Sequence, residues 1–369
     1  MTIATPLPPS SPEHSASGLD QVIAAETRLS HVDGAAGRLI LRGYDLADLA
    51  GWRFEEVLAL LWADLTPISL DAHSISAALG AARLYAFHLM EPLLPATDAL
   101  SEVEALRLLL AALPDDSKPP HPVLAVAAVP VFTAAIARRR RGLEPVPPMA
   151  DLGLATDFLH MLHGQPATQA QIRGLEAYLV TVADHGLNAS TFAARVIAST
   201  KAGLFSSVLG GLCALKGPLH GGAPGPVLDM LDAIGNDAAI RPWLSAALDR
   251  GERLMGFGHR IYRVRDPRAD VLKGAVSALG ADSARIRFAQ AVEAQALALL
   301  AERKPERALQ TNVEFYTALL LEALGFDRTS FTNVFAAGRM AGWTAHVLEQ
   351  EMTGRLMRPQ SLYTGPWPA

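Results

Sequence analysis

The chain has 369 residues, half of them hydrophobic, which is enough to build a large core in one or two domains. Its formal net charge of -5 gives no global basic field, so we expect no nucleic-acid partner. The single cysteine, Cys213, excludes an internal disulfide framework and a cysteine-based zinc cluster, and it fits a cytoplasmic location.

The N-terminal part of the chain predicts a tail and then a small β-structure. Residues 1–17 are rich in proline and serine and contain no lysine or arginine. We expect a disordered tail there, with neither a signal peptide nor a mitochondrial presequence. In residues 25–42, a glycine-bearing turn separates two short runs with β-branched or bulky side chains, which predicts a minor β-hairpin.

The remaining pattern is helical. Alanine and leucine dominate, and apolar residues recur at spacings of three and four. The clearest predicted helices cover residues 55–64, 284–303 and 331–350. The most apolar stretch, Val123–Ala137, is shorter than the roughly 20 residues of a membrane span. We therefore expect a buried core helix and no membrane partner. The run Arg138–Arg141 would lie at the C-terminus of this helix, where positive charges complement the helix dipole.

Glycine and proline mark the expected boundaries. A Gly/Pro loop at residues 216–226 should open a helix at about Pro226. Gly325 is an expected helix C-cap, with Thr329 or Ser330 as the next N-cap. These glycine and proline positions predict a small domain at residues 217–325, inserted into a large domain made of residues 18–216 and 326–369.

Three side chains with acid–base potential stand in distinctive local contexts: His220 in GPLHGG, His259 in GFGHR and Glu314 in TNVEFY. Glycines beside a histidine let a ligand approach closely, and histidine exchanges protons near neutral pH. The trio suits acid–base carbon chemistry without a metal or a covalent nucleophile. Structural alternatives stay open, because His220 could cap the following helix and Thr311 with Glu314 matches a capping box.

Basic side chains near these motifs indicate an anionic ligand. Arg268 follows Asp266 and Pro267, which read as the start of a helix, so its charge opposes the helix dipole unless an anion is bound. Arg339 lies on a helix face of alanine and glycine and must find an anion or water. His185 stands at a loop-to-helix junction and, taken alone, would be structural.

In order along the chain, five segments carry a family resemblance: DHGLNASTFAARVIAST, GPLHGG, LMGFGHRIYRVRDPR, NVEFY and GRMAGWTAHVLEQ. From about Gly18 to Trp367 the chain resembles the citrate synthase family. The resemblance implies an all-α fold with a large and a small helical domain, and active sites between the domains of a homodimer. The chain is short for the family's hexameric, NADH-regulated branch, which favours the dimer.

The resemblance also implies residue roles. His220 would stabilise the enolate of acetyl-CoA, Glu314 would remove its methyl proton, and His259 would polarise the ketone of oxaloacetate. The oxaloacetate carboxylates would be held by His185, Arg268, Arg339 and, across the subunit boundary, Arg358. No cofactor is expected beyond the CoA thioester substrate. Its CoA part would contact Leu254, Met255, Gly256, Phe257 and Gly258, with Arg263, Lys304 and the run Arg138–Arg141 as candidates at the phosphates.

Two positions depart from the family pattern, which has aspartate at Glu314 and usually proline at Thr311. The added methylene lengthens the side chain, and a displacement of roughly 1 Å can cost on the order of 100-fold in rate. The intrinsic pKa changes little, from about 3.9 for aspartate to about 4.3 for glutamate. We therefore expect a citrate synthase, with three alternatives: a 2-methylcitrate synthase using propionyl-CoA, a citryl-CoA lyase, or a regulatory paralogue that binds oxaloacetate without turnover.

Overall fold

The structure is a computed structural model. The predicted tail at residues 1–17 and the candidate CoA contact Arg263 lie outside the residues that it describes. The described residues are 22–66, 71–115, 120–221, 224–259, 261–262, 264–280, 283–307, 309–361 and 363–368.

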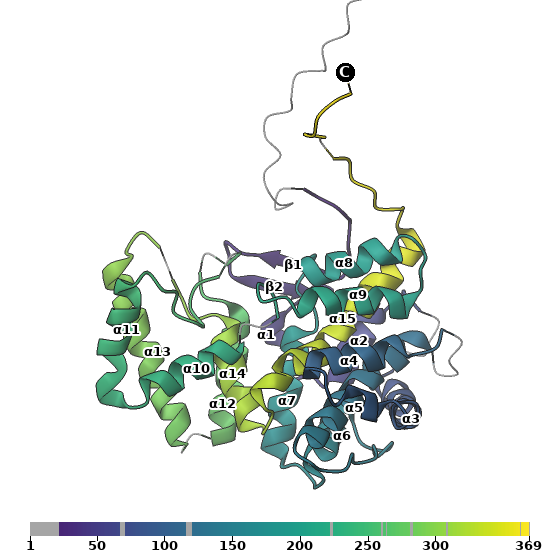
Figure 1. Ribbon diagram of the computed structural model, residues 1–369, viewed down its shortest axis with the longest axis horizontal. Coiled ribbons are helices and arrows are strands. Elements are labelled where there is room, and N and C mark those ends of the chain that lie inside the picture. The colour runs from purple at the N-terminus through teal and green to yellow at the C-terminus, as the bar shows by residue number, and fades with distance from the viewer. Residues whose placement is uncertain are drawn as a thin grey trace, which may run out of the picture.

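The fold is almost entirely helical, as predicted, with a small antiparallel sheet near the start of the chain (Figure 1). Leu39 and Leu41 alternate with outward-facing residues, so both leucines are buried beneath the sheet. The predicted hairpin is confirmed and gains a third strand; the strands are β1 (Ser30–Asp33), β2 (Arg38–Leu41) and β3 (Tyr44–Asp45), in that order.

In the described part of the chain, nine α-helices and the short 3-10 helix η1 follow before residue 216. The predicted helix at 55–64 is α2, and the most apolar stretch forms α5, which is almost completely buried and continues to Arg140. The elements are α1 (Leu46–Leu49), α2 (Phe54–Trp62), α3 (Ala72–Met90), η1 (Leu94–Thr97), α4 (Glu102–Ala111), α5 (His121–Arg140), α6 (Leu154–His163), α7 (Gln169–Val182), α8 (Ala189–Ala198) and α9 (Leu204–Leu215).

Helix α5 is long and apolar enough to cross a membrane by length and composition, but 89% of that apolar window is buried within the protein. Helices α3, α4, α6 and α15 pack around it. The interpretation of this stretch as a core helix is confirmed.

The second group of helices lies together on one side of the molecule (Figure 1). Helix α13 covers the predicted residues, whereas α10 begins at Pro224 and not at Pro226. Helix α12 connects this group to the rest by packing against α7, but the proposed division into two domains stays a prediction. The elements are α10 (Pro224–Ile234), η2 (Asp237–Ala239), α11 (Ile240–Asp249), α12 (Pro267–Gly280), α13 (Ala284–Arg303) and α14 (Val313–Ala323).

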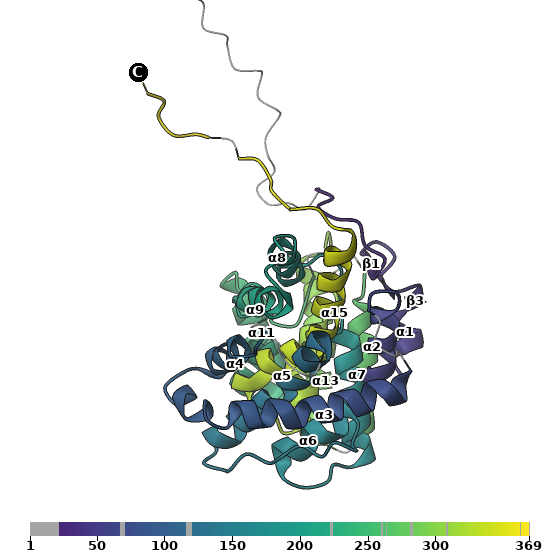
Figure 2. The same cartoon turned by 90° about the vertical axis from the view of Figure 1, so that its right-hand side faces the viewer.

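The chain then returns to the first group through η3 (Arg328–Ser330) and α15 (Phe331–Thr353). Gly325 has φ +82° directly after the C-cap of α14, as expected for a helix end. Ser330 is the N-cap residue of α15, one of the two predicted, but its side chain does not cap the helix, because the hydroxyls of Thr329 and Ser330 bond to Glu102 instead. Beyond α15 the C-terminal segment runs away from the body of the chain (Figures 1 and 2).

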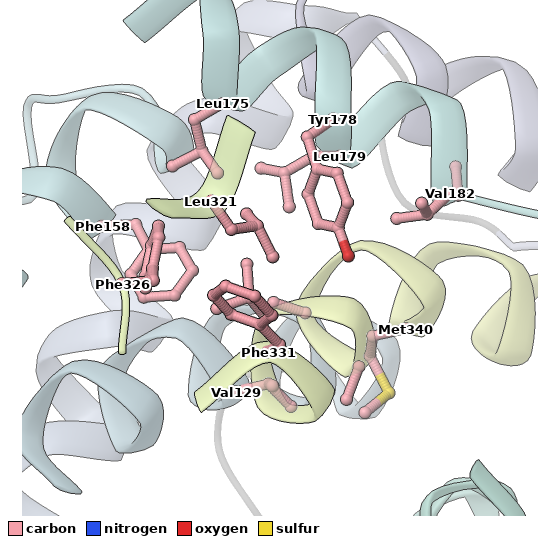
Figure 3. Close-up of a cluster of buried hydrophobic side chains, with 14 of the residues drawn as sticks. Val129, Phe158, Leu175, Tyr178, Leu179, Val182, Leu321, Phe326, Phe331 and Met340 are labelled. Carbon is pink, nitrogen blue, oxygen red and sulfur yellow. The ribbon is translucent and has the colours of Figure 1, made fainter. Parts of the chain in front are cut away.

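A cluster of buried side chains joins the two groups (Figure 3). Phe158 of α6 meets Phe326, with ring centroids 5.2 Å apart. Leu321 of α14 lies near Tyr178 of α7 in the same cluster. This apolar junction holds the helix that carries Glu314 close to α7 and α15.

Candidate active site

Two loops pair as a short ladder and place His259 near the start of α14. Phe257 and Thr311 form an isolated antiparallel bridge. Gly258 N donates to Gln310 O at 2.8 Å, and Asn312 N donates to Gly256 O at 2.9 Å. Gly256 has φ +87°, and a Cβ there would lie 2.9 Å from Phe315 Cβ. Only glycine suits that position, which explains the first glycine of the GFGHR motif.

The predicted capping box at the start of α14 is wrong. Asn312 is the N-cap, and its Oδ1 accepts a hydrogen bond from Glu314 N at 3.0 Å. The Thr311 hydroxyl donates instead to Glu293 Oε1 at 2.7 Å. Glu314 therefore has no capping role, and its carboxylate makes no hydrogen bond to any residue that the structure describes.

The half-buried Glu314 carboxylate is poised to exchange a proton near neutral pH. Burial raises its pKa to about 7, because a charged carboxylate loses solvation there. The positive charges of Arg268 and Arg339 lower the pKa, while Asp266 raises it. A carboxylate with a pKa near the working pH is suited to general-base catalysis.

Each ring nitrogen of His259 lies next to an N–H group of another residue. Its Nδ1 accepts hydrogen bonds from the backbone N–H groups of Ile261 and Tyr262 at 3.0 and 3.1 Å, which places the ring proton on Nε2. Arg268 Nη2 lies 3.1 Å from that Nε2. Arg268 Nη2 and His259 Nε2–H are thus both hydrogen-bond donors at the same place, where one oxygen of a ligand could accept from both. Burial, and then the charge of Arg268, lower the pKa of His259 to about 4, so the ring is neutral at pH 7.

Arg268 is buried at the first turn of α12 and pairs with Asp266. Burial alone would lower its pKa, but the Asp266 carboxylate outweighs burial and the pKa is raised. Asp266 Oδ2 also accepts Val313 N at 3.2 Å, which connects α12 to the start of α14. The predicted conflict with the helix dipole is therefore offset within the chain by Asp266.

Sequence reasoning missed Tyr262. Its hydroxyl lies 3.1 Å from His185 Nε2, and its ring centroid lies 4.8 Å from that of His259. Burial, followed by the charges of Arg268 and Arg339, lowers the pKa of His185 well below its ordinary value. His185 is therefore neutral and accepts a hydrogen bond from the Tyr262 hydroxyl at Nε2. No sequence pattern marks this contact, because the two residues are 77 positions apart.

A second polar chain surrounds His220. Its Nε2 lies 2.8 Å from Ser190 Oγ, which also lies 2.8 Å from Asn188 Oδ1 and accepts Trp343 Nε1–H at 3.2 Å. The Ser190 hydroxyl donates its single proton to Asn188 Oδ1, so His220 Nε2 carries the ring proton and donates to Ser190 Oγ. Burial, and then Arg339, lower the pKa of His220 to about 4. Sequence reasoning missed Ser190, although Asn188 before it is a recognisable N-cap.

Arg339 lies on the buried face of α15. Its Nε donates to Val182 O at 2.7 Å, and its guanidinium lies 4.9 Å from the centre of the Phe335 ring. Burial lowers its pKa to about 10, against the opposing influence of Asp184. Arg339 is therefore still charged at pH 7, and its field acts on His185, His220 and Glu314.

Other predicted site residues lie elsewhere. Arg358 is exposed in the C-terminal segment, and Lys304 is the half-buried C-cap of α13. The arginine run at the end of α5 has structural partners, which argues against a role in CoA binding. Arg139 pairs with Asp98, Arg141 pairs with Asp327, and Arg138 and Arg140 donate to backbone carbonyls.

The arrangement combines a carboxylate of raised pKa, three neutral imidazoles and two buried arginines. Such a site can remove a proton from a carbon acid while neutral donors stabilise the resulting oxyanion. Among the described residues, no group of three or more histidine, cysteine, aspartate or glutamate side chains could hold a metal ion.

Comparison with known proteins gives one family throughout. Residues 18–360 match the family described as citrate synthase, C-terminal domain. Citrate synthase of Haloferax volcanii is 39% identical and covers 94% of this chain and 95% of its own. The 2-methylcitrate synthase of Mycobacterium tuberculosis is 36% identical and covers 94% and 90%. A citrate synthase from Thermoplasma acidophilum, in ternary complex with carboxymethyl coenzyme A and oxaloacetate, superposes with a TM-score of 0.86 at 25% identity, covering 97% of this chain and 98% of that one.

Proposed function

Because this chain belongs to the citrate synthase family, we propose that it condenses acetyl-CoA with oxaloacetate to form citrate and CoA. Family membership makes the protein a transferase that converts an acyl group into an alkyl group on transfer. The observation that supports the specific reaction best is the Glu314 carboxylate, which has a pKa of about 7 and no hydrogen-bond partner among the described side chains. A base in that state is available to a carbon acid.

In the proposed mechanism, Glu314 removes a proton from the methyl group of acetyl-CoA. His220 donates a hydrogen bond from its ring to the thioester oxygen, which stabilises the enolate as it forms. The enolate carbon adds to the ketone of oxaloacetate, and His259 Nε2–H protonates the resulting alkoxide. Water then hydrolyses the thioester of citryl-CoA, which releases citrate and the CoA thiol.

The two carboxylates of oxaloacetate need several hydrogen-bond donors. We assign them to the cations Arg268 and Arg339 and to the neutral His185, joined by Arg358 of the partner subunit in a homodimer. Arginine forks bind carboxylates through paired hydrogen bonds. The exposure of Arg358, on a segment that leaves the body of its own chain, supports a contribution across subunits (Figure 2). The loop at residues 254–258, with Lys304 and Arg263, would receive CoA; the proposal includes no further cofactor and a cytoplasmic location.

A second candidate is 2-methylcitrate synthesis from propionyl-CoA. The similar identities to a citrate synthase and to a 2-methylcitrate synthase support keeping both acyl donors. CoA thiol release, measured with oxaloacetate and each acyl-CoA in turn, separates them by the ratio of kcat/KM values.

Glu314→Gln tests the assigned base, because the amide retains the shape of the side chain and cannot accept the proton. We expect thiol release to fall to background. Full activity in Glu314→Gln would refute the assignment. Oxaloacetate binding by calorimetry without any thiol release would indicate the regulatory paralogue, and cleavage of citryl-CoA to acetyl-CoA and oxaloacetate without synthesis would indicate the lyase.

A further inference from the structure

One buried carboxylate beside the site has no role in the proposed chemistry. Glu293 of α13 is only 4% exposed and receives hydrogen bonds from three different segments. The Thr311 hydroxyl donates to Oε1 at 2.7 Å, and the Tyr316 hydroxyl and Lys273 Nζ approach Oε2 at 2.5 and 3.1 Å. A buried carboxylate is costly unless it is paired in this way. Glu293 therefore connects α12, α13, α14 and the loop before α14.

These contacts surround the proposed base. Thr311 precedes Glu314 by three residues and Tyr316 follows it by two, so one carboxylate holds both sides of the first turn of α14. The Glu314 carboxylate has no hydrogen bond of its own to a described residue. Its position must then come from the backbone of that turn. A proline at position 311 could not make the hydroxyl contact.

We propose that Glu293 is a positioning residue for Glu314, acting through Thr311 and Tyr316 to hold the first turn of α14 at the distance that proton transfer requires. This inference rests on the proposed role of Glu314 as the base. A displacement of about 1 Å at a reacting group can cost on the order of 100-fold in rate. The anchor therefore matters most for a base whose side chain is long and unrestrained.

The electrostatics of Glu314 provide a readout that does not depend on turnover. Burial raises its pKa, and Asp266 just before α12, Arg268 of α12, Tyr178 of α7 and Arg339 of α15 all interact with it. If the first turn loosens, the carboxylate gains water and its pKa falls. A mutation that only lowers the stability of the fold would not produce that shift.

The experiment compares Thr311→Val, Tyr316→Phe and Glu293→Gln with wild type, in the full-length protein. The first two variants each remove a single hydroxyl and preserve the fold even if Glu293→Gln does not. Glu102→Gln is the matched control, since Glu102 is also a buried carboxylate that accepts two hydroxyls, from Thr329 and Ser330. Thermal unfolding, kcat and the KM for oxaloacetate are measured, and the Glu314 pKa is followed by carbon-13 NMR, assigned with Glu314→Gln.

We expect kcat to fall about 10- to 100-fold in the Glu293, Thr311 and Tyr316 variants, with a lowered Glu314 pKa and little change in the KM for oxaloacetate. Glu102→Gln should lose stability but retain both kcat and the Glu314 pKa. Folded Thr311→Val and Tyr316→Phe proteins with wild-type kcat and pKa would overturn the proposal. An equal effect in Glu102→Gln would overturn it as well. If wild type releases no thiol, the proposed function fails, and the NMR titration still decides the role of Glu293.

Discussion

Arg268 and Asp266 form a two-pronged ion pair at the start of α12, in which Nε and Nη2 donate to Oδ1 and Oδ2 at 3.0 and 2.9 Å. Burial would raise the pKa of Asp266, but the pairing with Arg268 lowers it below its ordinary range. The pair thus places a permanent negative charge next to Glu314, and that charge contributes to the raised pKa of the proposed base.

Asp266→Asn should therefore lower the pKa of Glu314. Removing a negative charge makes ionisation of the neighbouring carboxylate easier, and Arg268, left without its partner, acts in the same direction. We expect the acid limb of the kcat/KM profile for acyl-CoA to move to lower pH. Asp270→Asn serves as the control, because Asp270 is an exposed partner of Arg265 on the same helix. An unchanged acid limb in Asp266→Asn would contradict this account.

The activity of the wild-type protein should depend on pH through Glu314. With a pKa of about 7, the base is mostly ionised at pH 8 and about one-tenth ionised at pH 6. We expect kcat/KM for acyl-CoA to fall about tenfold for each pH unit below 7. His220 and His259, with pKa values of about 4, remain neutral over that range. A flat profile between pH 6 and 8 would exclude Glu314 as the base.

Glu314→Asp tests whether the site is built around the longer side chain. The backbone at and just before Glu314 is held by Asn312 and, through Thr311, by Glu293, so it cannot advance to compensate for the lost methylene. We expect kcat to fall by about 10- to 100-fold with the fold retained, as judged by circular dichroism. A rise in kcat would show instead that glutamate is a compromise at this position.

Ser190→Ala should impair the enolate-stabilising step. Without the hydroxyl, His220 Nε2 loses the contact that selects its tautomer, and Trp343 Nε1 loses its acceptor. We expect a fall in kcat of about 10- to 100-fold with a nearly unchanged KM for oxaloacetate. Ser207→Ala is the matched control, because Ser207 is a buried helical serine that bonds only to Gly203 O among the described residues. Equal losses in the two variants would argue against a role in catalysis.

Two glycine-to-alanine substitutions should change stability in opposite directions. At Gly342 of α15, a Cβ would lie 2.4 Å from Ala183 O and 2.6 Å from Asp184 Oδ1. Overpacking there should cost about 1–3 kcal/mol and weaken oxaloacetate binding by displacing the neighbouring His185. At Gly274, inside α12, a Cβ meets nothing within 4 Å, so alanine should raise the free energy of unfolding by about 0.5–1 kcal/mol. Chemical denaturation of both variants measures the difference.

Glu176 should make stability depend on pH. Its Oε2 accepts Phe54 N–H at 2.6 Å, and burial, with Glu55 nearby, raises its pKa to about 8. Between the ordinary pKa near 4.5 and this value, the folded protein binds more protons than the unfolded chain, so stability falls as pH rises. Glu176→Gln removes this titration, and its melting temperature should exceed that of wild type by more at pH 8 than at pH 5. Equal differences at the two pH values would contradict the prediction.

Local pattern by itself determined much of this protein. Apolar spacing located α13 to the residue, because a helix needs an apolar stripe to bury and ends where the stripe ends. Glycines identified the close loop approach at Gly256, because only glycine fits there. The order of five motifs was enough to indicate the family, which the comparisons confirm.

Only the tertiary structure decided which hydrogen-bond or ion-pair partner each polar side chain has. The same spacing of Thr311 and Glu314 suits a capping box or a free base, and Glu293, 18 residues away, takes the threonine hydroxyl and excludes the box. The sequence offers Arg141 as a candidate phosphate ligand, whereas the structure pairs it with Asp327, 186 residues away. Helical periods and turns are local properties of the chain, whereas the partner of a charged or polar side chain depends on which distant segments packing brings within hydrogen-bond reach.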